Sequence, residues 1–160
     1  MARRESDRED LLEEATGLDP CWEFRLHNET VPTVAGFRKN GNLTIYLREG
    51  TMFHFDPVGR LRRAYVAGEL YRSEGRTISR LRRERTDDST TLLRKDLGDA
   101  ELRDWLEREW KILVELLERL ENGEYLLLRK RGAESDGIGR LLAALKSIVQ
   151  SPPRISAPLR

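Results

Sequence analysis

The stretch from Val34 to Arg48 reads VAGFRKNGNLTIYLR, and it has the pattern of a β-hairpin. Two runs of apolar, β-branched and aromatic residues flank Asn40-Gly41, a dipeptide that tolerates the positive φ angles of a two-residue type I′ turn. In the second run apolar side chains recur at every other position, at Leu43, Ile45 and Leu47. Because side chains of a strand alternate between its faces, residues 34–38 and 43–48 are expected to pair with one face turned inward.

The same pattern continues on both sides of this hairpin. Between residues 21 and 95, short apolar runs are separated by turn signals such as Asp56-Pro57-Val58-Gly59 and Glu74-Gly75. Turns that recur about every seven to ten residues leave no room for crossover helices. We therefore expect an antiparallel up-and-down β-meander of about six to eight short strands, which could stay open or curl toward a barrel.

After Gly98 the period of the apolar residues changes from two to about 3.6. The apolar stripe consists of Leu102, Trp105, Leu106, Trp110, Leu113, Leu116, Leu117 and Leu120. Asp99 is expected as the N-cap, and Gly123 follows the predicted end of the helix. The pattern predicts a long amphipathic helix over residues 99–122 and an α+β fold in which the meander packs against this C-terminal helix.

The chain has the length of one domain, and residues 1–150 are expected to form it. Within it we expect an N-terminal arm or short helix over residues 1–20, the meander over 21–95, the long helix over 99–122, and a strand and a short helix over 125–150. Residues 151–160 are expected to form a tail, because the prolines that follow Ser151 cannot continue a helix.

The composition excludes several classes of protein. Lys and Arg number 29 against 28 for Asp and Glu, so the net charge of +1 provides no overall attraction to nucleic acid or to an anionic membrane. The single cysteine, Cys21, cannot form an internal disulfide, which fits a reducing compartment. The charged N-terminus lacks the apolar core of a secretory signal, and no apolar run approaches the roughly 18 to 20 residues needed to cross a bilayer. A cytoplasmic protein without membrane contacts is expected.

Sequence motifs for catalysis are missing from the chain. It has neither a glycine-rich phosphate-binding loop nor a serine in a glycine-flanked elbow. The two histidines, His27 and His54, fall on different predicted strands and lack nearby cysteines or carboxylates at metal-ligand spacing. We therefore expect a protein that holds neither a cofactor nor a metal, and an enzyme is the minority interpretation, which would require His27 or His54 to converge with carboxylates in a cleft.

A local excess of arginine is the one anomaly. Between Gly59 and Thr86 nine arginines stand against three glutamates, and two tyrosines are interleaved with them. Arginine suits bidentate contacts to phosphate, and tyrosine suits stacking on bases. This stretch is predicted to contact nucleic acid or another anionic partner through Arg60, Arg62, Arg63, Tyr65, Tyr71, Arg72, Arg76, Arg80, Arg82, Arg83 and Arg85.

Three alternatives remain open. The predicted helix over 99–122 has eight acidic and four basic residues, so the arginines could neutralise it in a structural or oligomeric protein that has no ligand. The helix stripe could also bury part of itself against a second copy, in a homo-oligomer. A pocket for a small apolar ligand could lie between the curved sheet and the helix, lined by Trp22, Phe24, Phe53, Phe55, Trp105 and Trp110.

Overall fold

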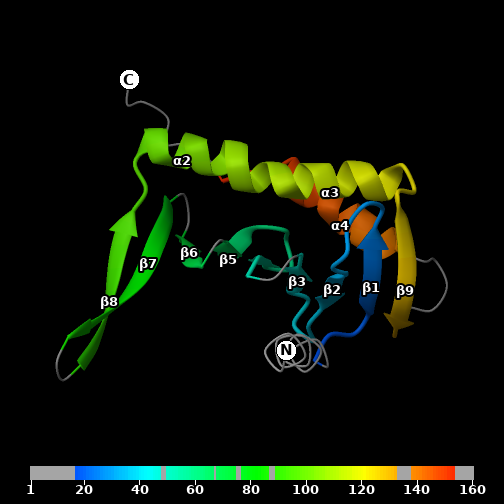
Figure 1. The fold of residues 1–160 in the computed structure, drawn as a ribbon, viewed down its shortest axis with the longest axis horizontal. Helices are drawn as coiled ribbons and strands as arrows, with labels where there is room; N and C mark the ends of the chain where they lie inside the picture. Colours follow the sequence, from blue (N-terminus) through cyan, green and yellow to red (C-terminus); the bar gives the residue numbers. More distant parts are fainter. Residues whose placement is uncertain are drawn as a thin grey trace.

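The computed structural model of the protein describes residues 17–47, 50–66, 68–74, 77–86, 89–132 and 138–153. For residues 74, 77, 83–86 and 91 it describes the backbone alone. The fold is α+β, as expected, with a nine-stranded antiparallel sheet and a long helix. Figure 1 shows this helix running from the β8 end of the sheet to the β9 end. The expected N-terminal arm and C-terminal tail fall mainly on residues 1–16 and 154–160, outside the described ranges.

Eight strands form the meander, and a ninth follows the long helix. They are β1 (Cys21–Leu26), β2 (Thr33–Phe37), β3 (Leu43–Tyr46), β4 (Met52–Phe55), β5 (Leu61–Val66), β6 (Glu69–Glu74), β7 (Thr77–Thr86), β8 (Ser89–Asp96) and β9 (Tyr125–Arg131). Their order in the sheet is β8-β7-β6-β5-β4-β3-β2-β1-β9. The sheet is open, since β8 and β9 lie at opposite edges and do not pair, so the expectation that it could curl toward a barrel is not met.

The hairpin between β2 and β3 forms as predicted, but its turn differs. Gly41 has φ +91°, and its N–H donates to the carbonyl of Arg38 at 2.9 Å, while the Arg38 N–H donates to the Asn42 carbonyl at 2.8 Å. Positive φ is found at Gly41 and not at Asn40, so the predicted type I′ turn is wrong. These bonds describe a type I turn followed by a bulged glycine, which is the usual three-residue hairpin loop.

The long helix comprises α2 (Asp99–Trp105), a π-helical turn η1 (Leu106–Trp110) and α3 (Lys111–Glu121). Its expected C-terminal position is wrong, because β9 and a shorter helix, α4 (Gly139–Val149), follow it. The N-cap is Gly98 rather than Asp99, and the Glu101 carboxylate accepts a hydrogen bond from the Gly98 N–H at 3.5 Å. A π-turn brings residues five apart onto one side, so Trp105 and Trp110 both face the core.

One hydrophobic core lies between the sheet and the helices. It joins the helix-facing residues of the sheet to the apolar stripe of the long helix and to Leu141, Leu145 and Ile148 of α4. Aromatic pairs tie the layers together: the ring of Phe55 meets that of Trp110 at 6.2 Å, and the ring of Tyr71 meets that of Trp105 at 5.6 Å. Complete burial of such a side chain contributes about 1.5–3 kcal/mol to folding.

A smaller apolar cluster lies on the opposite face of the sheet, over β1 to β4. It consists of Leu18, Cys21, Val34 and Tyr46, with Met52 packed against it. Helices long and apolar enough to cross a membrane are not found in the described part of the chain.

Candidate functional site

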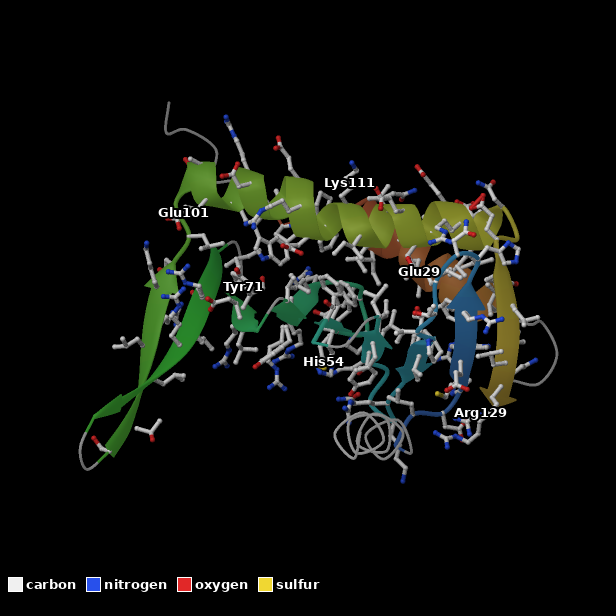
Figure 2. All side chains as sticks on the ribbon, viewed as in Figure 1. Glu29, His54, Tyr71, Glu101, Lys111 and Arg129 are labelled. Atoms are coloured by element: carbon white, nitrogen blue, oxygen red, sulfur yellow. The ribbon has the colours of Figure 1, made fainter. Side chains whose placement is uncertain are left out.

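The register of the sheet divides its side chains between two faces. Direct cross-strand partners project to the same face, so one assigned residue fixes its partners on every neighbouring strand. Phe55 and Tyr71 contact the long helix and define the helix-covered face. We call the other face the outer face. Figure 2 shows Tyr71 on the side toward the helix and His54 on the side away from it.

A row of polar residues crosses the outer face, with one residue from each of six consecutive strands. Each member is the direct partner of the next, in the order Thr44, His54, Arg63, Arg72, Ser79 and Asp96. At the β3 end of the row, the Thr44 hydroxyl oxygen lies 2.9 Å from Nδ1 of His54. We call these six residues the polar row.

Two arginines stand opposite each other at the centre of this row. Arg63 of β5 and Arg72 of β6 are direct partners, and both side chains are exposed. Directly opposite residues of an antiparallel pair lie about 4.5–5.5 Å apart at their Cα atoms. The pair therefore concentrates positive charge at the centre of the polar row.

An aromatic ring lies beside the arginine pair. Tyr65 is two residues from Arg63 on the same strand, which places both side chains on one face about 7 Å apart. The ring is 39% exposed. Tyr65 belongs to a second row on the outer face, formed by Tyr46, Met52, Tyr65, Leu70, Leu81 and Arg94.

The β8 end of the polar row is a hydrogen-bonded network. The Ser79 hydroxyl donates to the Asp96 carboxylate at 2.6 Å and accepts from Nε of Arg94 at 3.1 Å. The hydrogen bonds from Ser79 and from Arg94 hold the pKa of Asp96 below its ordinary value of 3.8. Arg94 also pairs with Asp96 at 3.3 Å, so the one carboxylate of the row is bound next to its own counter-ion.

Replacing Ser79 with alanine is expected to raise the pKa of Asp96, because Ser79 is the largest cause of its depression. A lowered pKa in the folded state means that the ionised carboxylate stabilises the fold above the ordinary pKa. This stabilisation is lost as the pH falls through the folded value. An NMR titration of the Asp96 carboxyl carbon measures the shift, and Thr44→Ala, at the other end of the row, should leave it unchanged. An Asp96 pKa that is the same in Ser79→Ala and wild type would contradict the network.

Three of the residues predicted to contact an anion lie on the helix-covered face instead. Tyr71 packs on Trp105, and burial raises the pKa of its hydroxyl. Arg80 is the partner of Tyr71, and its Nε is buried without a hydrogen-bond partner among the described residues. Arg82 pairs with Glu69 at 2.8 Å, and this bond lowers the pKa of Glu69. The predicted arginine-rich surface is therefore divided between two faces of the sheet.

The remaining predicted residues are distributed as follows. Arg60 is exposed in the turn before β5, and Arg62 is exposed at a bulge where β5 shifts register against β4. Arg76 lies outside the described residues, as do the side chains of Arg83 and Arg85. Of the predicted set, the structure brings Arg63, Tyr65 and Arg72 together.

A metal centre and a cysteine nucleophile are both unsupported in the described part of the chain. No three His, Cys, Asp or Glu side chains there could hold a metal ion. Cys21 is 8% exposed, and burial raises the pKa of its thiol. A protonated, buried thiol is a poor nucleophile.

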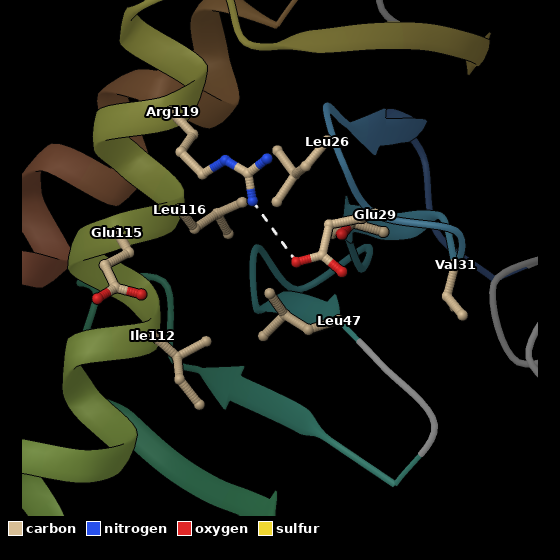
Figure 3. A pocket seen from close by; sticks show the side chains of 9 residues that line it. Leu26, Glu29, Val31, Leu47, Ile112, Glu115, Leu116 and Arg119 are labelled. Atoms are coloured by element: carbon tan, nitrogen blue, oxygen red, sulfur yellow. Dashed lines mark ion pairs between the residues drawn. The ribbon is translucent and has the colours of Figure 1, made fainter.

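The six aromatic residues named for an apolar pocket lie in the packed core, at exposures of 0 to 5%. A surface groove lies elsewhere, between α3 and the ends of β1 and β3 (Figure 3), and is lined by Leu26, Glu29, Val31, Thr33, Leu47, Ile112, Glu115, Leu116 and Arg119. An ion pair of 3.6 Å between Glu29 and Arg119 spans it. Its volume of about 110 Å³ is well below the roughly 300–1,000 Å³ of typical ligand pockets.

Sequence reasoning did not assign Thr44, His54, Ser79 and Asp96 of the polar row to this surface, nor Arg94 beside it. A signal for them exists in the hairpin between β7 and β8. Its register pairs Thr86 with Ser89, and continuing this pairing places Asp96 opposite Ser79 and Arg94 opposite Leu81. Extending the hairpin register along the strands would have located both residues.

Comparison of the chain with protein-family models, with curated proteins and with solved structures finds no match.

Proposed function

We propose that the outer face between β4 and β8 binds single-stranded nucleic acid. Arg63 and Arg72 contact phosphates, and Tyr65 stacks on a base. A sheet with an exposed aromatic ring next to basic side chains is a common platform for single strands, because every base has a face on which an aromatic ring can stack. The partner class is thus the one expected from the sequence, but the contact surface is smaller and confined to one face.

The observation that supports this most directly is the arginine pair itself. Arg63 and Arg72 are direct partners, and both are exposed, so two guanidinium groups are presented close together on the outer face. The acidic long helix lies on the other face, so neutralisation of that helix does not account for Arg63 and Arg72. Each guanidinium group can bind a phosphate with two hydrogen bonds.

The first test is fluorescence anisotropy with labelled single-stranded RNA and DNA, at about 50 and about 200 mM salt, where phosphate contacts must weaken binding steeply. The double variant Arg63→Ala/Arg72→Ala is expected to bind more weakly. It should also reduce the slope of log K against log salt by about 1.4, since each phosphate contact to a single strand contributes about 0.7. Tyr65→Ala is expected to weaken binding by about 5- to 150-fold, the effect of losing one stacked base, with little change in the slope.

Two control variants test whether binding depends on the outer face or only on the total positive charge of the protein. Arg82→Ala removes an arginine of the same stretch from the helix-covered face, and Arg103→Ala removes an exposed arginine from α2. Both should bind as wild type does. Equal losses in all arginine variants would indicate a nonspecific charge effect, and the absence of binding at low salt would refute the proposed function.

A further inference from the structure

One edge of the sheet, formed by β8, is open to pairing with a further strand. β8 lies at the end of the strand order, and β7 is its only neighbour in the described sheet. Its ladder with β7 runs without irregularity through eight residue pairs, from Ser79 with Asp96 to Thr86 with Ser89. A long, regular edge strand presents a row of backbone N–H and C=O groups to which another strand can add.

The β7–β8 ribbon also carries apolar side chains on both faces. Figure 1 shows the ribbon extending away from the long helix toward its tip. Leu92 and Leu93 belong to β8 and are 57% and 48% exposed. Because adjacent residues of a strand point to opposite faces, neither face of the ribbon buries its leucine within the monomer.

The opposite edge of the sheet is protected from pairing. β9 also exposes leucines, at Leu126 and Leu128, but its ladder with β1 shifts register between Glu23 and Phe24. It then ends in the basic run Arg129-Lys130-Arg131. Bulges and runs of charge are the devices by which natural sheets prevent edge-to-edge association. The first five residues of β8, Ser89 to Leu93, contain no charge.

We propose that β8 is a homodimer interface, in which it pairs antiparallel with β8 of a second copy about a two-fold axis perpendicular to the sheet. Such an axis places a residue opposite itself, and the exposed leucines put the centre at Leu92 or Leu93. Centred on Leu92, Arg94 faces Thr90 of the second copy; centred on Leu93, Arg94 faces Leu92 and Thr90 faces Asp96 of the second copy. Within Ser89–Asp96 neither register places like charges opposite each other, so charge repulsion does not oppose pairing of the strand with a second copy of itself.

The geometry has a consequence for the proposed nucleic-acid surface. A two-fold axis perpendicular to the sheet keeps the outer faces of both copies on one side. The polar rows of the two sheets would then share one continuous face. This consequence rests on the proposed function, whereas the dimer itself rests only on the edge strand and its leucines.

Sedimentation of the full chain tests the interface over a protein concentration of about 1 to 100 μM, because mass action makes dimerisation depend on concentration. Wild type is expected to reach twice the 18.6 kDa mass of one chain. Leu92→Lys/Leu93→Lys should remain a monomer, since it places like charges at the centre of the pair. Leu126→Lys/Leu128→Lys, the matched change on the β9 edge, should dimerise as wild type does.

Thermal unfolding followed by circular dichroism must show that both lysine variants fold, which is expected because the replaced leucines are exposed. Hydrogen exchange provides a second readout, in which β8 amides become protected as wild-type concentration rises. The proposal would be overturned if wild type sediments as a monomer at every concentration. It would also be overturned if Leu126→Lys/Leu128→Lys fails to dimerise while Leu92→Lys/Leu93→Lys still does. Binding of single strands by the β8 variant, measured in parallel, separates failure of the dimer from failure of the proposed function.

Discussion

Replacing Trp22 with alanine is expected to lower the free energy of unfolding by about 3 to 5 kcal/mol. Trp22 lies in β1 on the helix-covered face and is 0% exposed. Its ring meets that of Phe37 edge to face at 6.0 Å. Removal of a fully buried indole loses its transfer free energy and leaves a cavity that the rigid sheet can only partly fill, which places the effect among the largest single substitutions.

Urea unfolding measures this loss, with Val58→Ala as the control. Val58 is 71% exposed in the turn between β4 and β5, so its truncation should change stability by less than about 0.5 kcal/mol. The result also bears on the alternative of an apolar-ligand pocket. A loss below about 1 kcal/mol for Trp22→Ala would indicate that the indole borders open space, as that alternative requires.

The features that the sequence predicted well are those determined by local pattern. Each hairpin of the meander joins neighbouring strands through a short turn, so alternation and turn residues suffice to place it. The apolar stripe of the long helix likewise depends only on residues three and four apart. Gly123, with φ +72°, ends that helix at the predicted position. Local consistency of this kind explains why the α+β fold was predictable.

The distribution of the arginines between the two faces was not predictable, because it depends on a bulge. At Arg62 the chain of β5 gains a residue relative to β4, so Leu61 and Ala64, three residues apart, both face the core. Strict alternation cannot hold across such a site. On β7 the difficulty is different, because apolar residues lie on both faces: Ile78 is buried in the core, whereas Leu81 lies on the outer face. Hydrophobicity alone therefore does not show which face Arg80 and Arg82 occupy.

Two further features arise from long-range packing. The pairing of β9 with β1 joins residues about a hundred positions apart, through bonds such as that between Arg129 and Glu23 at 3.0 Å. Periodicity identifies such a strand but does not name its partner. The π-turn follows from the need to direct both Trp105 and Trp110 at the sheet, a requirement that only the packed core imposes.

Replacing Gly36 with alanine is expected to destabilise the protein by about 2 to 3 kcal/mol, near the upper end of the usual effect of overpacking. Gly36 lies in β2 on the outer face, opposite Cys21. A Cβ atom there would lie 2.7 Å from Cβ of Leu18 and 2.8 Å from the carbonyl oxygen of Pro20. Both distances are well inside van der Waals contact, so the neighbouring segment would have to move.

That segment is held in place, which is why the cost is large. The Pro20 carbonyl accepts from the Phe37 N–H at 3.0 Å, and the Asp19 N–H donates to the Phe37 carbonyl at 2.8 Å. Relief of the clash would break these bonds and disturb the apolar cluster around Leu18. Gly17→Ala is the matched control, because a Cβ atom there meets nothing within 4 Å, and its stability should change by less than about 1 kcal/mol. Equal midpoints of urea unfolding for the two variants would show that the segment before β1 does not pack on Gly36.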